Sequence, residues 1–100
     1  MSELKRIEKI LKKNKEHLKN KFYVEKIGVF GSYSKGKETP ESDIDILVKF
    51  NGPIGWDFIS LNDHLEQLLG NKVDLVSIRA LKPQLKDDIL SEVVYVWKKR

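Results

Sequence analysis

The chain opens with an amphipathic stretch and then changes to shorter, more continuously apolar segments. Helical spacing relates Leu4, Ile7, Leu11 and Leu18, and lysines fill many of the positions between them. One apolar stripe with a charged remainder is typical of a helix that packs on one side only. The pattern therefore predicts a single helix over residues 3–20.

Downstream, segments rich in β-branched and aromatic residues alternate with segments of helical spacing, and glycine or proline separates them. This order indicates a layered α/β domain of α+β type, in which a mixed β-sheet of about four strands is flanked by helices. We expect one minimal domain over residues 1–100. Its predicted strands cover 22–30, 44–50, 72–78 and 93–97, and its further helices begin at Ser32 and cover 56–69 and 81–91.

Composition restricts the cellular location and the kind of partner expected for this domain, but it does not assign a function. The 100 residues are 40% apolar, include no cysteine and carry a formal net charge of +4. The lack of cysteine excludes disulfides and thiolate metal sites and suits a reducing, cytoplasmic location. The mild basicity suits a phosphate-bearing or acidic partner, although a solvated surface of lysine and glutamate explains it equally well. No apolar run approaches the roughly 20 residues that a membrane span needs.

Two aspartates, Asp43 and Asp45, flank Ile44 at the start of the predicted strand 44–50. Residues two apart in a strand point to the same face, so the two carboxylates are expected side by side. Like charges this close repel each other unless a cation binds between them. Oxygen ligands in this arrangement suit Mg²⁺ or Mn²⁺. The alternative is an exposed strand face with two aspartates that bind nothing.

Asp74 is a single acid in an otherwise apolar predicted strand. A lone carboxylate among apolar neighbours costs free energy unless it is paired or binds a metal. If the strands 44–50 and 72–78 are neighbours, Asp74 completes a cluster of three carboxylates with Asp43 and Asp45. The alternative is an exposed position on an edge strand.

The junction of Gly31 and Ser32, at the end of the first predicted strand, is a candidate anion site. Glycine lets the backbone approach a ligand closely, and N–H groups at a helix start bind anions. Lys35 and Lys37 follow nearby and supply positive charge for phosphate oxygens. Ordinary solvated loops also contain glycine, serine and lysine, so these residues are weak evidence when taken alone.

The histidines and tryptophans are not expected to carry chemistry. His17 and His64 have no neighbouring ligand pattern, and we expect both at the surface. Trp56 and Trp97 are interpreted as packing or interface residues rather than as platforms for base stacking.

Taken together, these residues resemble the signature of the DNA polymerase beta-like nucleotidyltransferase superfamily. That signature is Gly-Ser, a short loop ending in glycine, and then Ser-Asp-x-Asp on the next strand. Here residues 31–36 read Gly-Ser-Tyr-Ser-Lys-Gly and residues 42–45 read Ser-Asp-Ile-Asp, while Asp74 matches the third acid. The short chain is similar to the minimal nucleotidyltransferases, often called MNT-type antitoxins.

The resemblance implies transfer of a nucleoside monophosphate from a triphosphate to an acceptor hydroxyl, with release of pyrophosphate. It implies that Asp43, Asp45 and Asp74 hold two Mg²⁺ ions, in the manner of two-metal sites, and that Asp74 also helps to deprotonate the acceptor. The positions implied to contact the nucleotide and its phosphates are Gly31, Ser32, Lys35 and Ser42.

One position departs from the family pattern. Many minimal members have Ala-Arg-Gly where this chain has Ser34-Lys35-Gly36. Lysine keeps the positive charge but loses the bidentate fork of arginine. The exchange puts the phosphate contact of Lys35 and the activity of the enzyme in question.

The leading hypothesis is an enzyme that transfers AMP from ATP to a tyrosine of a small helical HEPN-type toxin, so that the chain acts as an antitoxin. One alternative is a contact-only antitoxin whose active site is vestigial. Another is transfer of a nucleotide to a small molecule. A second copy of the chain is a further way to complete the site, and neither a membrane nor a nucleic acid is expected as a partner.

Overall fold

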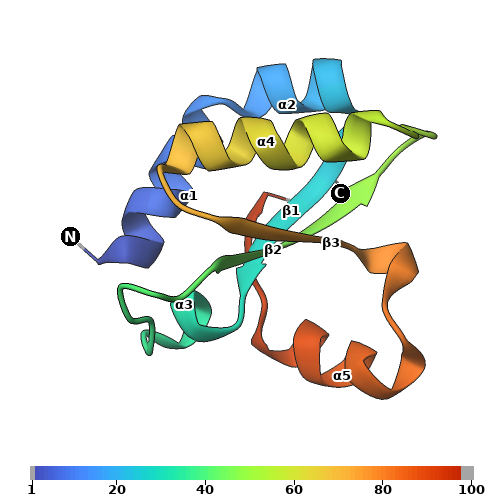
Figure 1. Ribbon diagram of the computed structural model, residues 1–100. Helices are drawn as coiled ribbons and strands as arrows, with labels where there is room; N and C mark the ends of the chain where they lie inside the picture. The colour runs from blue at the N-terminus through green and yellow to red at the C-terminus, as the bar shows by residue number, and fades with distance from the viewer. Residues whose placement is uncertain (1, 98–100) are drawn as a thin grey trace.

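The structure, a computed structural model, describes residues 2–97, and their four strands form one mixed sheet (Figure 1). The spatial order is β3-β2-β1-β4, so β2 and β1 lie in the middle. β1 pairs antiparallel with β2 and with β4, whereas β2 and β3 run parallel. The predicted mixed sheet is confirmed. The strands are β1 (Val24–Phe30), β2 (Ile44–Phe50), β3 (Val73–Ser77) and β4 (Val94–Trp97).

Helices α1 (Glu3–Lys13), α2 (Lys15–Phe22) and α4 (Asp57–Leu69) cover one face of this sheet, and α5 (Pro83–Glu92) lies on the other side (Figure 1). α3 (Ser32–Lys35) is a single turn between β1 and β2. α4 is the crossover that joins the parallel strands β2 and β3, as parallel pairing requires.

The core lies between the sheet and the three helices on its covered face. Its side chains alternate along each strand and recur every three to four residues along each helix, as one-sided burial requires. Buried core residues include Ile7, Leu11, Leu18, Ile27, Val29, Ile44, Ile46, Val48, Leu61, Leu65 and Leu69. The apolar stripes seen in the sequence are therefore the buried faces of the elements.

The first predicted helix, residues 3–20, is two helices, and that prediction was wrong. The chain breaks at Asn14, whose side-chain Nδ2 donates to the Ile10 carbonyl at 2.8 Å. Asparagine competes in this way with the backbone for hydrogen bonds and interrupts helices. Leu11 in α1 and Leu18 in α2 are both buried in the core, one on each side of the break.

The first strand begins two residues later than predicted. Phe22 ends α2, and Tyr23 caps it with a left-handed φ of 56° before β1 starts at Val24. β2 begins at Ile44, so Asp43 lies just before the strand rather than inside it. The remaining predicted elements begin and end within two residues of the observed ones.

A short 3-10 turn, η1 (Ile78–Ala80), separates β3 from α5. α5 buries none of its side chains, and Leu85 on this helix is 49% exposed. None of the helices within residues 2–97 is long and apolar enough to cross a membrane.

Candidate active site

Asp45 and Asp74 lie directly beside each other on neighbouring strands. The parallel register of β2 and β3 pairs Asp45 with Asp74, and on its other side Asp45 is paired with Phe30 near the end of β1. In a sheet, residues that are paired in register point to the same face. The neighbours of both acids along their strands are buried in the core, so the carboxylates project from the opposite face.

The surroundings of Asp45 raise the pKa of its carboxyl group to about 6. Burial is the largest cause, and the negative charges of Asp74 and Asp43 follow. Interaction with the adjacent Asp74 carboxyl group raises the pKa further. Negative charge is therefore concentrated around Asp45, and a bound cation would relieve the repulsion there.

The donor set suits a hard divalent cation, because it consists of carboxylate oxygens at the rim of the sheet. Asp43 is exposed at the start of β2, Asp45 is half-buried and Asp74 is exposed. Among the described residues, no three acids or histidines are gathered closely enough to hold a metal ion by themselves. Mg²⁺ in proteins commonly takes one or two carboxylates and fills its remaining positions with water and substrate phosphates. The acid pair fits that pattern.

Gly31 lies directly against the Asp45 carboxylate, and a residue with a side chain does not fit this position. A methyl group built on Gly31 would collide with the Asp45 carboxylate, and the backbone has a φ of +72°. Glycine alone adopts this region without a steric penalty. The Gly-Ser junction at the end of β1 therefore lies beside Asp45.

The turn after Gly31 is fixed from both sides. The Ser34 hydroxyl donates to the Gly31 carbonyl at 2.8 Å. Tyr33 is buried, and its hydroxyl oxygen accepts from Asn71 Nδ2 at 2.9 Å. Because Asn71 precedes β3, the hydrogen bond ties the turn to the strand that carries Asp74. The predicted helical turn from Ser32 is confirmed as α3.

Glu92, the last residue of α5, is the residue of this site that sequence reasoning missed. Its Oε1 accepts the Gly31 N–H at 3.0 Å, and its Oε2 forms an ion pair with Lys35 Nζ at 2.9 Å. The hydrogen bond from Lys35 is the largest influence on Glu92 and lowers the pKa of its carboxyl group. No local pattern reveals this contact, because Gly31 and Glu92 are 61 positions apart.

Ser42 holds the loop before β2 together. Its Oγ accepts the Thr39 N–H at 2.9 Å and lies 3.3 Å from the Thr39 hydroxyl. These contacts close the loop just before Asp43. Lys37 follows Gly36 and is exposed, and its N–H bonds to the Ser32 carbonyl.

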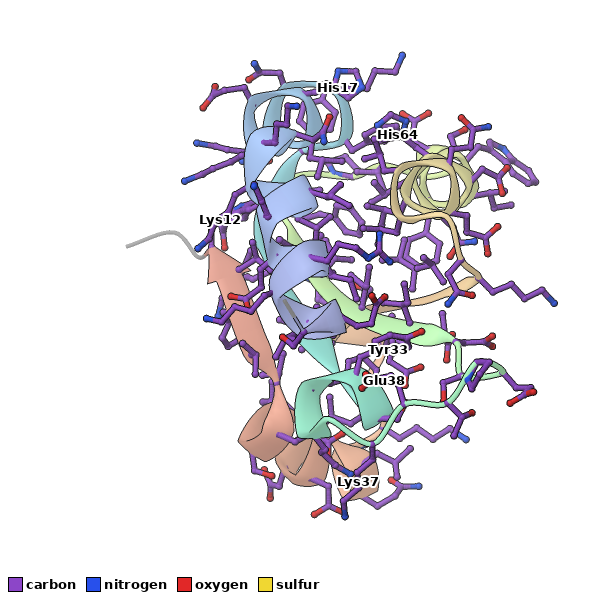
Figure 2. The ribbon with its side chains drawn as sticks, turned by 90° about the vertical axis from the view of Figure 1, so that its left-hand side faces the viewer. Lys12, His17, Tyr33, Lys37, Glu38 and His64 are labelled. Atoms are coloured by element: carbon purple, nitrogen blue, oxygen red, sulfur yellow. The ribbon has the colours of Figure 1, made fainter. Side chains whose placement is uncertain are left out.

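His64 is half-buried, so the prediction that it is a surface residue was wrong, whereas His17 is exposed as expected. The ring centroids of His17, from α2, and His64, from α4, are 5.0 Å apart (Figure 2). His64 Nε2 is buried without a hydrogen-bond partner among the described residues. Burial, and then the charge of His17, lower the pKa of His64.

The two tryptophans have different surroundings. Trp97 is buried in the core, which confirms its predicted packing role. Trp56 is 86% exposed just before α4.

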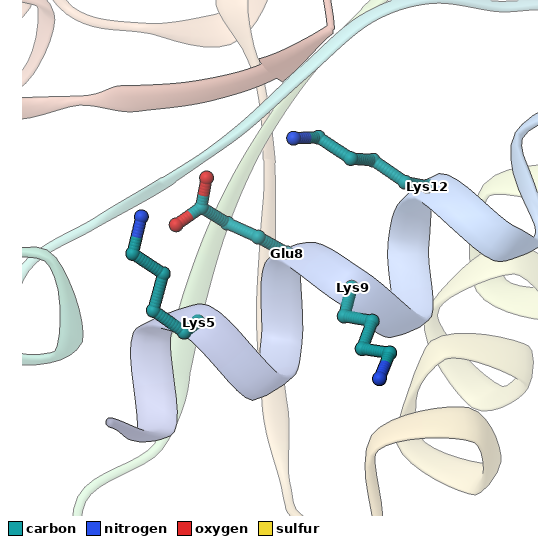
Figure 3. A pocket seen from close by; sticks show the side chains of 4 residues that line it. All are labelled: Lys5, Glu8, Lys9 and Lys12. Carbon is teal, nitrogen blue, oxygen red and sulfur yellow. The ribbon is translucent and has the colours of Figure 1, made fainter. Parts of the chain in front are cut away.

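A pocket of about 430 Å³ lies against α1 (Figure 3). It is lined by Lys5, Glu8, Lys9 and Lys12, which are successive positions on one helix face. Among residues 2–97 only α1 lines this pocket, so the described lining lacks the convergent groups from several elements that binding sites usually have.

The mixed sheet, with paired acids beside a Gly-Ser turn, defines a nucleotidyltransferase domain. The chain belongs to the family described as polymerase beta, nucleotidyltransferase, whose model matches residues 5–100. It is 47% identical to the protein adenylyltransferase MntA of Thermococcus cleftensis, over 96% of this chain and 98% of that protein. A Methanocaldococcus jannaschii protein named as a candidate protein adenylyltransferase is 42% identical, over 96% of this chain and all of the relative.

Solved structures agree with this assignment. A protein described as a candidate minimal nucleotidyltransferase is 35% identical with a TM-score of 0.73, over 94% of this chain and 95% of that one. A chain of a toxin–antitoxin complex with AMP-PNP is 28% identical with a TM-score of 0.71, over 100% and 76%. A chain from the complex of tri-AMPylated Shewanella oneidensis HEPN toxin with MNT antitoxin is 26% identical with a TM-score of 0.62, over 97% and 71%. The resemblance to minimal nucleotidyltransferases is thereby confirmed.

Proposed function

We propose that this nucleotidyltransferase transfers AMP from ATP to a tyrosine hydroxyl of a small helical HEPN-type toxin and so acts as its antitoxin. The observation that carries the proposal is the acid pair of Asp45 and Asp74 next to the Gly31 backbone. Nucleotidyl transfer needs this combination, in which negatively charged ligands for cations lie beside donors for phosphates.

The support for a toxin as the acceptor comes from the similar proteins. The Thermococcus protein is named a protein adenylyltransferase, and structural neighbours at 26% and 28% identity come from toxin–antitoxin complexes. One of those complexes contains an AMPylated HEPN toxin and another contains AMP-PNP, a close analogue of ATP.

In this proposal Asp43 and Asp45 are the ligands for Mg²⁺, and Asp74 serves both as a ligand and as the base for the acceptor. Gly31 and Ser32 hold phosphate oxygens through their N–H groups and the Ser32 hydroxyl, and Lys35 adds a positive charge. Ser42 keeps the loop before Asp43 closed, as its bonds to Thr39 indicate.

The reaction follows from the placement of these groups. The tyrosine hydroxyl gives its proton to Asp74, its oxygen forms a bond to the α-phosphorus, and the bond to the departing pyrophosphate breaks. A bound divalent cation would neutralise the triphosphate and the carboxylates. The fixed turn at Gly31 orients the triphosphate, and such positioning supplies much of the rate in phosphoryl transfer.

The test is incubation of the protein with ATP labelled on the α-phosphate, Mg²⁺ and the HEPN-type toxin encoded beside it. We expect label on the toxin and loss of its ribonuclease activity. A toxin in which the acceptor tyrosine is replaced by phenylalanine should take up no label. If the intact protein neutralises the toxin without transferring label, contact alone explains the antitoxin effect and the enzymatic proposal is wrong.

A further inference from the structure

The free protein places one of its own carboxylates where the proposed function needs a phosphate. Glu92 Oε1 lies 3.0 Å from the Gly31 nitrogen, and Glu92 Oε2 lies 2.9 Å from Lys35 Nζ. The carboxylate thus bridges a backbone donor and a cation with its two oxygens. Phosphate oxygens bind to the same kinds of donor, namely backbone N–H groups and lysine.

A nucleotide phosphate and Glu92 compete for these donors. Gly31 has only one N–H, and Glu92 already accepts it. Lys35 carries one positive charge, which Glu92 neutralises. Glu92 also adds its negative charge to the surroundings of Asp45, so its presence opposes the approach of a polyanion in two ways.

The ion pair between Lys35 and Glu92 forms in the free protein, and a competing anion can break it. The Lys35 and Glu92 side chains are 49% and 24% exposed, and solvent weakens ion pairs of this kind. α5, which carries Glu92, buries none of its side chains. Little packing therefore opposes a rotation of the Glu92 side chain or a small shift of the helix end.

We propose that Glu92 is an internal competitor of the nucleotide, which occupies the phosphate donors of Gly31 and Lys35 in the free protein and is displaced when a triphosphate binds. The inference rests on the proposed function, which assigns phosphates to these two residues. It adds a residue of α5 to the determinants of nucleotide affinity.

The test compares Glu92→Gln with the matched control Asp88→Asn, which removes one negative charge from an exposed position one turn earlier on α5. The probes are inorganic tripolyphosphate without metal and ATP with Mg²⁺, titrated by calorimetry. We expect Glu92→Gln to bind tripolyphosphate more tightly by up to about fivefold, the range for loss of a partly exposed ion pair. Asp88→Asn should bind it with the affinity of the original protein.

Equal or weaker binding by Glu92→Gln would overturn the inference, because Glu92 would then support the turn rather than compete with the ligand. An equal gain in Asp88→Asn would overturn it as well, since general charge would explain the effect. Failure of the proposed function looks different, because neither the original protein nor Glu92→Gln would then bind ATP.

The Gly31 amide resonance is a second readout that does not depend on affinity. In the original protein its proton is bonded to a carboxylate, and saturation with ATP and Mg²⁺ should shift this signal. Glu92→Gln should shift the same signal in the absence of any ligand, while the rest of the spectrum shows a folded protein. An unchanged Gly31 signal in the folded variant would contradict the contact on which the inference depends.

Discussion

The two faces of the sheet differ in how much apolar surface they bury and in the charged groups they carry. The face under α1, α2 and α4 is a continuous apolar core in which Ile46 and Leu65 are fully buried. The opposite face carries Asp45 and Asp74, and the helix on its side buries no side chain. The first face supplies most of the buried core, whereas the second, which also buries Leu47, keeps charged groups accessible. The alternation of side chains along β2 and β3 makes both possible in the same strands.

The comparison shows where this small domain places its unfavourable interactions. Apolar burial on one side stabilises the fold by roughly 25 cal/mol for each Å² removed from water. Burial of the Asp45 carboxylate, together with repulsion from Asp74 and Asp43, lowers stability on the other side and raises the pKa of Asp45. Functional sites commonly keep such strain because the ligand relieves it. Mutations on the two faces should therefore have opposite consequences.

The largest expected effect is on catalysis from the acidic face. Asp45→Asn keeps the shape of the side chain but removes a cation ligand, and AMP transfer should fall by about 100-fold or more, the scale for loss of one preorganised charged group. Transfer of label to the toxin measures the effect, and Asp63→Asn, at an exposed position on α4, is the control. Activity of Asp45→Asn close to that of the control would show that the acid pair is not the catalytic centre.

The next largest expected effect is on the free energy of unfolding, and it distinguishes the covered face from α5. Leu61→Ala removes a fully buried side chain and should lower the free energy of unfolding by about 2–5 kcal/mol. Leu85→Ala removes a side chain that is 49% exposed and should change it by only about 0.5 kcal/mol. Urea denaturation measures both. Similar losses from the two substitutions would mean that α5 is part of the core after all.

A third, smaller effect has the opposite sign. The pKa of Asp45 is raised to about 6 in the folded protein from 3.8. A carboxyl group of this kind contributes stability below 3.8, and that stability is lost as the pH rises through about 6. With metal removed by EDTA, Asp45→Asn should therefore be more stable than the original protein at pH 7.5 by about 1–2 kcal/mol, because the Asp45 carboxylate is only partly shielded from water.

At pH 4 the two proteins in that comparison should have nearly the same stability. Thermal unfolding at a series of pH values measures the difference. A constant difference across the series would mean that it does not come from ionisation of Asp45.

The smallest expected effect is a pH dependence of stability that comes from His64, a polar residue on the covered face. Burial lowers the pKa of His64 from 6.5, with His17 adding to the shift. The neutral form of His64 therefore contributes stability above pH 6.5 that is lost as the pH falls through the lowered pKa. His64→Phe should reduce the loss of thermal stability between pH 7.5 and pH 5.5.

His17→Gln provides the matched control for that substitution. It should leave most of the pH dependence in place, because burial is the larger cause of the lowered pKa of His64. If His17→Gln removes the pH dependence as completely as His64→Phe does, the charge of His17 rather than burial controls the titration.

Local patterns were enough to predict most of the fold. The strand 44–50 was predicted with its observed ends, because alternation and the Asn-Gly-Pro break after Phe50 both mark it. The break at Asn14 could not be predicted from spacing, since it depends on one side chain turning back to the Ile10 carbonyl. The apolar stripe itself continues across the break.

The candidate site was predictable only as far as it lies in short motifs. Asp45 and Gly31 belong to one continuous signature, and the conditional pairing of Asp74 follows once the strands are known to be neighbours. Glu92 belongs to no motif, and its role depends on the distant end of α5 meeting α3. His64 likewise becomes half-buried only because α2 and α4 pack side by side.

The pairing of Asp45 with Asp74 also protects the fold against an error in assembly. A slip of β3 by one residue would turn Asp74 toward the apolar core and would turn the buried Val73 and Leu75 out to water. A buried charge without a partner is costly enough to reject that arrangement. Lengthening the crossover between β2 and β3 should therefore be tolerated, because the acid fixes the alignment of β3 independently of the length of chain that leads to it.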